Sequence, residues 1–256
     1  MQLLNFNSEG LEADAIKPEE WLGYFEIRIE EKPVLFERNI PVGIVSAIAG
    51  RKSIEIQFTG KTGHAGTEPM NMRRDALCAA AKFISGVEKY AQKEKRNMVA
   101  TIGAISVPDA ASNVIPGKVC CTLDMRCEDK ELLSDAYEDI NELCEKICDK
   151  RNIYFEWKLV SETEPVICSK KFRKLLSNSI SEKNIEIASL VSGIGSDAVM
   201  VSKVAPVAIL FVRCLKTINH HLSERVEDYD IATALDVSDH FIEQMILFPE
   251  KLTKKK

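Results

Sequence analysis

The stretch that decides the fold is "SIEIQFTGKTGHAGTEPMNMRRDAL", residues 53–77. Its first part places Ile54, Ile56 and Phe58 at every second position, which predicts a half-buried β-strand that stops at a glycine. Its last part opens an apolar run at helical spacing over residues 72–90, with a pair of arginines near the start. This spacing predicts about five turns of amphipathic helix.

Between the strand and the helix lies a histidine flanked by glycines, His64. The residue pattern alone leaves three interpretations open. His64 could bind a ligand, it could ligate a metal, or it could be a solvated polar residue in a turn that Gly63, Gly66 and Pro69 shape.

The same two patterns continue beyond this stretch. Strand-like alternation returns at residues 98–107, 118–127 and 153–160, and a second amphipathic helix is expected at 128–152. The order over residues 53–160 is then β-α-β-β-α-β. Two helices against a four-stranded sheet form an α+β unit, for which the ferredoxin-like arrangement is the natural candidate.

The segments on either side of this unit have a different pattern. A helix is expected near residues 171–181, a wholly apolar strand at 206–212 and a final helix at 230–247. A strand that is apolar throughout is typical of one buried on both faces of a sheet. We therefore expect an incomplete α/β domain into which the α+β unit is inserted.

Composition excludes several classes of protein. The net charge is −5, with 45% hydrophobic and 29% charged residues, which favours a globular protein and argues against nucleic acid as a partner. We expect no membrane span and no signal peptide, because no apolar run is long enough. Eight cysteines occur without a CxxC pair, and Cys144 and Cys148 are spaced for one buried helix face. A cytoplasmic protein with reduced thiols is expected.

Several motifs, in a fixed order, resemble those of one known family. "GYFEIRIEEKPVLFE", residues 23–37, is similar to that family's GYFE-hydrophobic-HIEQGPVLE segment, and "GHAGTEPMNMRRDAL" is similar to its HAGTTPM-x-x-RRDAL. The other matching segments are "SNVIPGKV" at 112–119, "LDMR" at 123–126, "SGIGSDA" at 192–198 and "TINHHLSE" at 217–224.

The family is that of the dinuclear-zinc amidohydrolases, which includes allantoate amidohydrolase, N-carbamoyl-L-amino-acid hydrolase and β-ureidopropionase. The resemblance implies an α/β catalytic domain with two zinc ions and a lid domain that also dimerises. It also implies hydrolysis of a ureido or amide C–N bond next to a carboxylate. In such enzymes a metal-bound water is the nucleophile and a glutamate is the general base.

Carried over residue by residue, the resemblance gives a substrate-binding set. His64 matches the lid histidine, Asn113 the asparagine of the NVIPG turn, and Arg126 the arginine of the D-x-R strand. Gly195 would let the backbone approach the ligand closely. These residues would grip the substrate carboxylate and its polar end, with residues of two subunits completing one site.

The metal-binding part of the family pattern is largely missing. Arg28 stands where the family has a zinc-binding histidine, Ser196 replaces a second histidine, and His220 is the one matched metal ligand that remains. Arginine cannot ligate zinc, and a catalytic zinc needs about three protein ligands. The family's HxD segment and its Glu-Glu pair are not recognisable before Trp21, because Glu19 and Glu20 lie too close to the GYFE segment. No catalytic residue is assigned, and we predict that this chain alone binds no zinc.

Two hypotheses follow from the sequence. The chain is the C-terminal part of a ureido-acid hydrolase, with residues 1–48 and 164–256 from the catalytic domain and 49–163 forming the lid. It would then be inactive unless a separate polypeptide supplied the zinc half. Alternatively, it is a non-catalytic protein that dimerises through the lid and binds a small ureido or carboxylate ligand.

Overall fold

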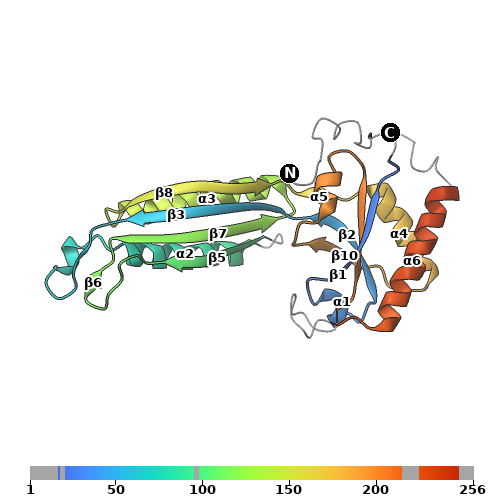
Figure 1. The fold of residues 1–256 in the computed structure, drawn as a ribbon, viewed down its shortest axis with the longest axis horizontal. Coiled ribbons are helices and arrows are strands. Elements are labelled where there is room, and N and C mark those ends of the chain that lie inside the picture. Colours follow the sequence, from blue (N-terminus) through green and yellow to red (C-terminus); the bar gives the residue numbers. More distant parts are fainter. Residues whose placement is uncertain (1–16, 18–20, 95–97, 215–224, 248–256) are drawn as a thin grey trace, which may run out of the picture. The chain divides into compact units, whose positions relative to one another are not determined.

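The computed structural model describes residues 17, 21–94, 98–214 and 225–247. The chain divides into two compact units (Figure 1). Unit 1 consists of residues 1–46 and 168–256, and unit 2 of residues 47–167. The predicted combination of an α/β part with an inserted sheet-and-helix part is confirmed at this level. Among the described helices, none is both long and apolar enough to cross a membrane.

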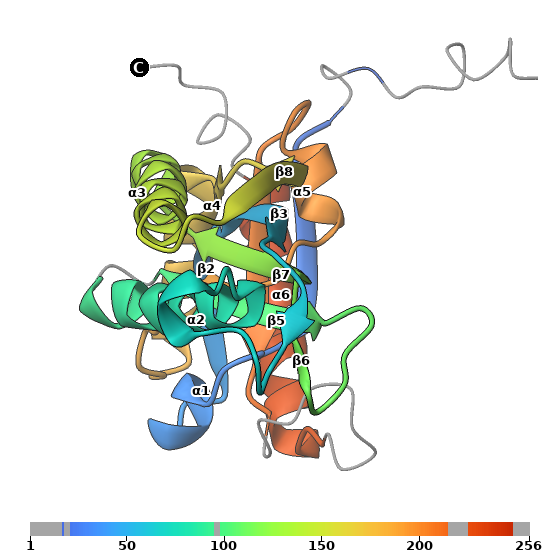
Figure 2. The ribbon, with the colours of Figure 1, turned by 90° about the vertical axis from the view of Figure 1, so that its left-hand side faces the viewer.

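Unit 2 is a four-stranded antiparallel sheet with two helices on one face (Figure 2). Its main elements are β3 (Gly50–Thr59), α2 (Ala76–Lys93), β5 (Val99–Ser106), β7 (Lys118–Cys127), α3 (Lys130–Asp149) and β8 (Tyr154–Thr163). The element order along the chain matches the predicted one. The strand order in the sheet is β5-β7-β3-β8, so the long strands β3 and β7 form its centre.

Alternation along the strands decides which face of this sheet the helices cover. Ile54, Ile56 and Phe58 on β3 are buried in the core beneath α2 and α3. Phe83 of α2 packs on Phe58 and meets the edge of Trp157 on β8. The intervening residues of β3, Glu55, Gln57 and Thr59, are polar and face away from the helices, so the sheet has one covered and one open face.

Both helices begin at a capping aspartate. Asp75 accepts a hydrogen bond from the backbone N–H of Cys78 at 2.9 Å, and Asp129 caps α3 in the same way. The predicted helix start near residue 72 is therefore wrong. Met72 ends a short 3-10 helix, η4 (Met70–Met72), and Arg73 has an extended backbone.

The predicted burial of the helix face with Cys144 and Cys148 is confirmed, because both side chains lie in the core of unit 2. The thiols therefore pack as small apolar groups, as free cysteines in protein cores commonly do.

Unit 1 is built around a mixed sheet with α4 and α6 packed on one face (Figure 1). Its elements are β1 (Tyr24–Ile29), α1 (Val34–Glu37), β2 (Val42–Ile48), α4 (Lys170–Glu182), β10 (Ser189–Ser192), α5 (Asp197–Val201), β11 (Val207–Val212) and α6 (Asp228–Leu247). The strand order is β1-β11-β2-β10, and β9 (Val166–Ile167) pairs with the end of β2. Every residue of β11 is buried, which confirms the prediction for the apolar strand.

A buried ion pair joins the end of β11 to the first turn of α6. Nε and Nη2 of Arg213 donate to the two carboxylate oxygens of Asp230 at 2.9 and 2.8 Å. The Asp230 side chain is fully buried, and Arg213 also donates to the side chain of Asn39. A buried carboxylate held by a two-pronged guanidinium is costly to leave without its partner.

We expect Arg213→Met to lower the free energy of unfolding of unit 1 by about 3–5 kcal/mol, because it strands the Asp230 carboxylate in the interior. Denaturant unfolding of the full chain, followed by Trp21 fluorescence in a Trp157→Phe background, measures this loss.

Arg225→Met is the matched control, since Arg225 forms an exposed ion pair with Glu227 at 3.9 Å. Its effect should stay within about 0.5 kcal/mol. Equal losses of unfolding free energy in the two variants would show that the buried ion pair stabilises unit 1 no more than the exposed one does.

Candidate functional site

Two of the predicted site residues, His64 and Asn113, lie side by side at one end of unit 2. They belong to a two-stranded ribbon of β4 (Gly63–His64) and β6 (Val114–Ile115), in which His64 lies opposite Val114. The backbone N–H of Ala65 donates to the carbonyl of Asn113 at 2.8 Å. Both predicted side chains are exposed, so they are available to a ligand. We call this end of unit 2 the tip.

The local backbone fixes the tautomer of His64. The backbone N–H of Gly66 donates to Nδ1 of the ring at 3.1 Å, so Nδ1 is an acceptor and the neutral ring carries its proton on Nε2. A side chain at Gly66 would press on the His64 ring at 3.3–3.4 Å. The Nε2–H group is thus presented as a hydrogen-bond donor.

Arg73 holds the loop that carries His64. Its Nε donates to the carbonyl of Glu68 at 3.0 Å and its Nη2 to the carbonyl of Ala65 at 2.6 Å. The sequence motif suggested only a helix start for this arginine. Its role in the structure is to close the loop between β4 and α2.

Arg126 lies at the opposite end of unit 2, which we call the base. It is the ninth residue of β7, and it pairs across the sheet with Arg51 of β3 and Val99 of β5. The eight steps of extended chain from Lys118 to Arg126 span about 26 Å. The structure therefore brings His64 and Asn113 together but does not bring Arg126 to them within one chain.

At the base, one carboxylate is shared by two guanidinium groups. Arg126 donates to Asp124 through Nε at 2.7 Å and Nη2 at 3.2 Å, and Arg51 donates through Nε at 2.6 Å. Burial alone would raise the pKa of Asp124, but the hydrogen bonds from Arg126 and Arg51 outweigh burial and lower it. Two guanidinium groups and one carboxylate therefore meet at the base.

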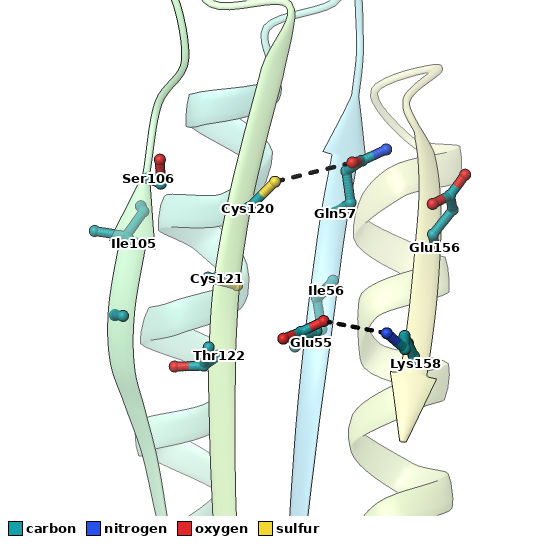
Figure 3. A pocket seen from close by; sticks show the side chains of 11 residues that line it. Glu55, Ile56, Gln57, Ile105, Ser106, Cys120, Cys121, Thr122, Glu156 and Lys158 are labelled. Carbon is teal, nitrogen blue, oxygen red and sulfur yellow. Dashed lines mark hydrogen bonds and ion pairs between the residues drawn. The ribbon is translucent and has the colours of Figure 1, made fainter. Parts of the chain in front are cut away.

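A hollow of about 420 Å³ lies on the open face of the sheet (Figure 3). Glu55 and Lys158 form an ion pair at 3.7 Å beside it, and the Cys120 thiol approaches the Gln57 amide oxygen at 3.9 Å. None of the predicted site residues lines it. Its only signal in the sequence was the row of polar residues at alternate positions of the strands.

In unit 1, the carboxylate of Glu31 fills a small anion-binding nest. It accepts hydrogen bonds from the backbone N–H groups of Gly193 and Ile194, and Nη2 of Arg28 lies 3.4 Å away. The Ser192 hydroxyl lies 3.4 Å from both carboxylate oxygens and has a closer acceptor in the carbonyl of Ile194, at 2.8 Å. Burial raises the pKa of Glu31, and these partners offset part of the rise. The sequence showed Glu31 only as a departure from the family motif.

The described residues do not fit a metal site. Arg28, at the position of a family ligand, is paired with Glu31, and the hydroxyl of Ser196 is buried without a hydrogen-bond partner. No group of three or more His, Cys, Asp or Glu side chains in the described part of the chain could hold a metal ion. His220, the predicted metal ligand, lies outside the described residues.

Gly195 lies in the exposed turn before α5. A side chain added there would meet only Val199, at 3.8 Å, so the chain itself leaves open space around this residue. The predicted close approach of a ligand to Gly195 therefore stays a prediction.

The fold defines a two-unit α/β protein whose inserted unit carries His64, Asn113 and Arg126, three of the predicted substrate-binding residues. Residues 47–152 match the family profile described as a peptidase dimerisation domain, M20_dimer. An N-carbamoyl-L-amino-acid amidohydrolase from Pseudomonas sp. (strain NS671) is 35% identical over 215 residues, which are 84% of this chain and 52% of that protein.

Two further comparisons agree with these. Allantoate deiminase 2 from Glycine max is 33% identical over 254 residues, covering 89% of this chain and 53% of that protein. The crystal structure of an amidase of the hydantoinase/carbamoylase family from Burkholderia multivorans superposes with a TM-score of 0.80 at 28% identity. That match covers 85% of this chain and 53% of the other. The chain belongs to this family of M20-type amidohydrolases and corresponds to its C-terminal part. It spans about half the length of the curated relatives.

The raised pKa of Glu31 predicts a pH effect on stability. A carboxyl group whose pKa is raised by folding gives its full contribution below the unfolded pKa and loses it as the pH rises through the folded pKa. We therefore expect the wild-type chain to lose stability relative to Glu31→Gln as the pH rises above the ordinary range for glutamate. Denaturant unfolding at a series of pH values measures the difference.

Glu243→Gln on the exposed face of α6 is the control. The difference in stability between this variant and the wild type should show no such trend. If the unfolding free energies of Glu31→Gln and the wild type change in parallel over the whole pH range, the prediction of a buried, titrating carboxyl group at Glu31 is contradicted.

Proposed function

We propose that the chain is the dimerising and substrate-gripping part of an amidohydrolase that acts on ureido acids such as N-carbamoyl amino acids or allantoate. The observation that carries this proposal is the separation of His64 and Asn113 at the tip from Arg126 at the base. One copy cannot complete the three-residue site, whereas two copies placed tip to base can.

The edge strand β5 supplies the means of placing two copies in this way. Residues 99–106 contain no proline and no charged residue, so the edge lacks the features that normally block strand pairing. The other edge, β8, carries Glu156, Lys158 and Glu162. Val99 of β5 lies beside Arg126, and Ser106 lies toward the tip. Two-fold antiparallel pairing of β5 with β5 of a second copy would bring the tip of one copy beside the base of the other.

Each residue would then have a defined task. Arg126 binds the substrate carboxylate with two parallel hydrogen bonds, in competition with Asp124. The Nε2–H group of His64 donates to the ureido oxygen, where negative charge develops as the carbonyl is attacked. The amide of Asn113 adds a directional contact. Activation of the water is no part of this scheme, because the described residues supply neither a metal site nor an identified general base.

Surface features of unit 1 support a further polypeptide partner that carries the zinc half. β1 is an edge strand whose Ile27 and Ile29 are about 40% exposed. On α6, a stripe of exposed apolar residues runs along the face away from the core: Ile231, Leu235, Ile242 and Ile246. Exposed apolar rows of this kind mark surfaces that another segment covers.

The alternative function is a non-catalytic dimer that only binds small carboxylates or ureido acids. The Arg28–Glu31 ion pair favours it, because this pair stands where the family has a metal ligand. The ferredoxin-like class of residues 49–163, the homodimer and a cytoplasmic location belong to both versions of the proposal.

Mixing two binding-deficient variants tests the composite site. His64→Ala and Arg126→Ala should each abolish binding of an N-carbamoyl amino acid, measured by calorimetry on the full chain. When equal amounts of the two variants are refolded together, half of the dimers should contain one copy of each. Each mixed dimer has one intact site out of two, so about a quarter of the wild-type binding capacity should return.

The control is Arg51→Ala mixed with Arg126→Ala, since both changes damage the base and no mixed dimer can regain a site. Binding by the His64→Ala and Arg126→Ala mixture no greater than by either variant alone would exclude a site shared between copies. A strictly monomeric chain in sedimentation would exclude the dimer.

Zinc titration by calorimetry separates the two versions. We expect no stoichiometric heat from the chain alone. If the hydrolase version is right, adding a polypeptide that carries the family's zinc half should produce tight zinc binding. If the chain and such a partner together still bind no zinc, the hydrolase version is excluded and the non-catalytic version is retained.

A further inference from the structure

A basic groove lies between α2 and α3 on the helix-covered side of unit 2. Its volume is about 1070 Å³, and residues 70–74, both helices and the turn at 151–152 line it. None of the residues assigned to the substrate site belongs to it. The proposed function therefore leaves this surface without a role.

Positive charge is concentrated in the groove. Seven of its fifteen lining residues are lysine or arginine and none is acidic, although the whole chain has a net charge of −5. Lys82 and Lys89 stand two turns apart on α2, about 10 Å along the axis. Lys146 lies in the last turn of α3, and Lys150 directly follows this helix, about 6 Å further along its axis. The two helices thus present facing rows of cations.

Most of this charge is not neutralised by neighbouring groups. Lys146 is paired with Glu142 of the same helix. Within the part of the chain that the structure describes, Arg74, Lys82 and Lys89 have no ion pair, and the same is true of Lys150. An unpaired row of like charges on two facing helices raises the electrostatic energy of the chain unless an anion binds there.

The floor of the groove is apolar. Gly86 of α2 faces Leu143 of α3 so closely that a side chain there would lie 2.8 Å from the leucine methyl group. Ile147 continues the floor, and Met70 and Met72 at the rim are 78% and 62% exposed. Exposed methionines beside an apolar floor are typical of surfaces that accept apolar side chains of a partner.

The basic walls and the apolar floor of the groove together indicate which class of ligand it can bind. No aromatic residue lines the groove, so it offers no stacking platform for the bases of a nucleic acid. We propose that the groove between α2 and α3 binds an acidic amphipathic helix of a partner protein, with apolar side chains on the Gly86–Leu143–Ile147 floor and carboxylates on the lysine walls. This is the helix-in-groove mode of peptide recognition, with charge complementarity added.

Fluorescence anisotropy with the full chain tests the proposal. The probe is a labelled synthetic helical peptide with leucines on one face and glutamates on its two flanks. It should bind in low salt and weaken as salt is added, because the contacts are ionic. A peptide of the same composition in scrambled order and a single-stranded oligonucleotide of equal charge should bind more weakly.

Charge reversal in the groove identifies the surface. Lys82→Glu combined with Lys150→Glu should weaken binding of the amphipathic peptide about tenfold or more. Lys82 is an exposed position of α2, where glutamate forms helix about as well as lysine, and Lys150 is the exposed residue that directly follows α3, so neither change removes a buried contact. Met70→Ser combined with Met72→Ser should weaken binding severalfold through the apolar rim alone.

The matched control is Lys174→Glu combined with Lys203→Glu, two exposed lysines of unit 1 that give the same net charge. It should leave binding unchanged. The proposal is overturned if the control weakens binding equally, if the oligonucleotide binds more tightly than the peptide, or if the peptide fails to bind. It is also overturned if sedimentation shows that the groove variant loses self-association, because a second copy would then be the occupant.

Discussion

The structure of unit 2 depends on the antiparallel pairing of β3 with β7. Ten residues of each strand are in register, from Gly50 opposite Cys127 to Thr59 opposite Lys118. Because side chains alternate along both strands, this register places all the apolar residues on the face that α2 and α3 cover. The same pairing makes the unit long and straight, and its length holds the His64 ribbon apart from Arg126.

In the proposed function, that separation is the reason why the site needs a second copy of the chain. A site that must hold both ends of a small ureido acid cannot stretch along a strand of about 26 Å. In the proposed dimer, pairing through the uncharged β5 edge would shorten the distance by setting the tip of one copy against the base of another. Under this proposal, the strand that carries Arg126 determines both the fold of the unit and the way in which the site is completed.

Much of this could be predicted from the sequence, because the alternating and helical periods depend on neighbouring residues. The strand phases of β3 and β7, the buried face with Cys144 and the apolar β11 all follow from local pattern. The start of α2 was missed because Asp75, not the arginine pair, supplies the cap. The nest around Glu31 joins residues 31 and 192–194, and the basic groove joins three separate segments. Contacts between residues so far apart in the sequence leave no signal in the local sequence pattern.

Electrostatics distinguishes the nest of unit 1 from the arginine pair at the base of unit 2. In unit 1, the nest at Ser192 already holds the carboxylate of Glu31, so an external anion would have to displace a covalently tethered one at high effective concentration. At the base of unit 2, the carboxylate of Asp124 is shared by the guanidinium groups of Arg51 and Arg126. Under the proposed function, a ligand carboxylate therefore competes with Asp124 for Arg126 at the base of unit 2, and the occupied nest of unit 1 is the less favourable place for it.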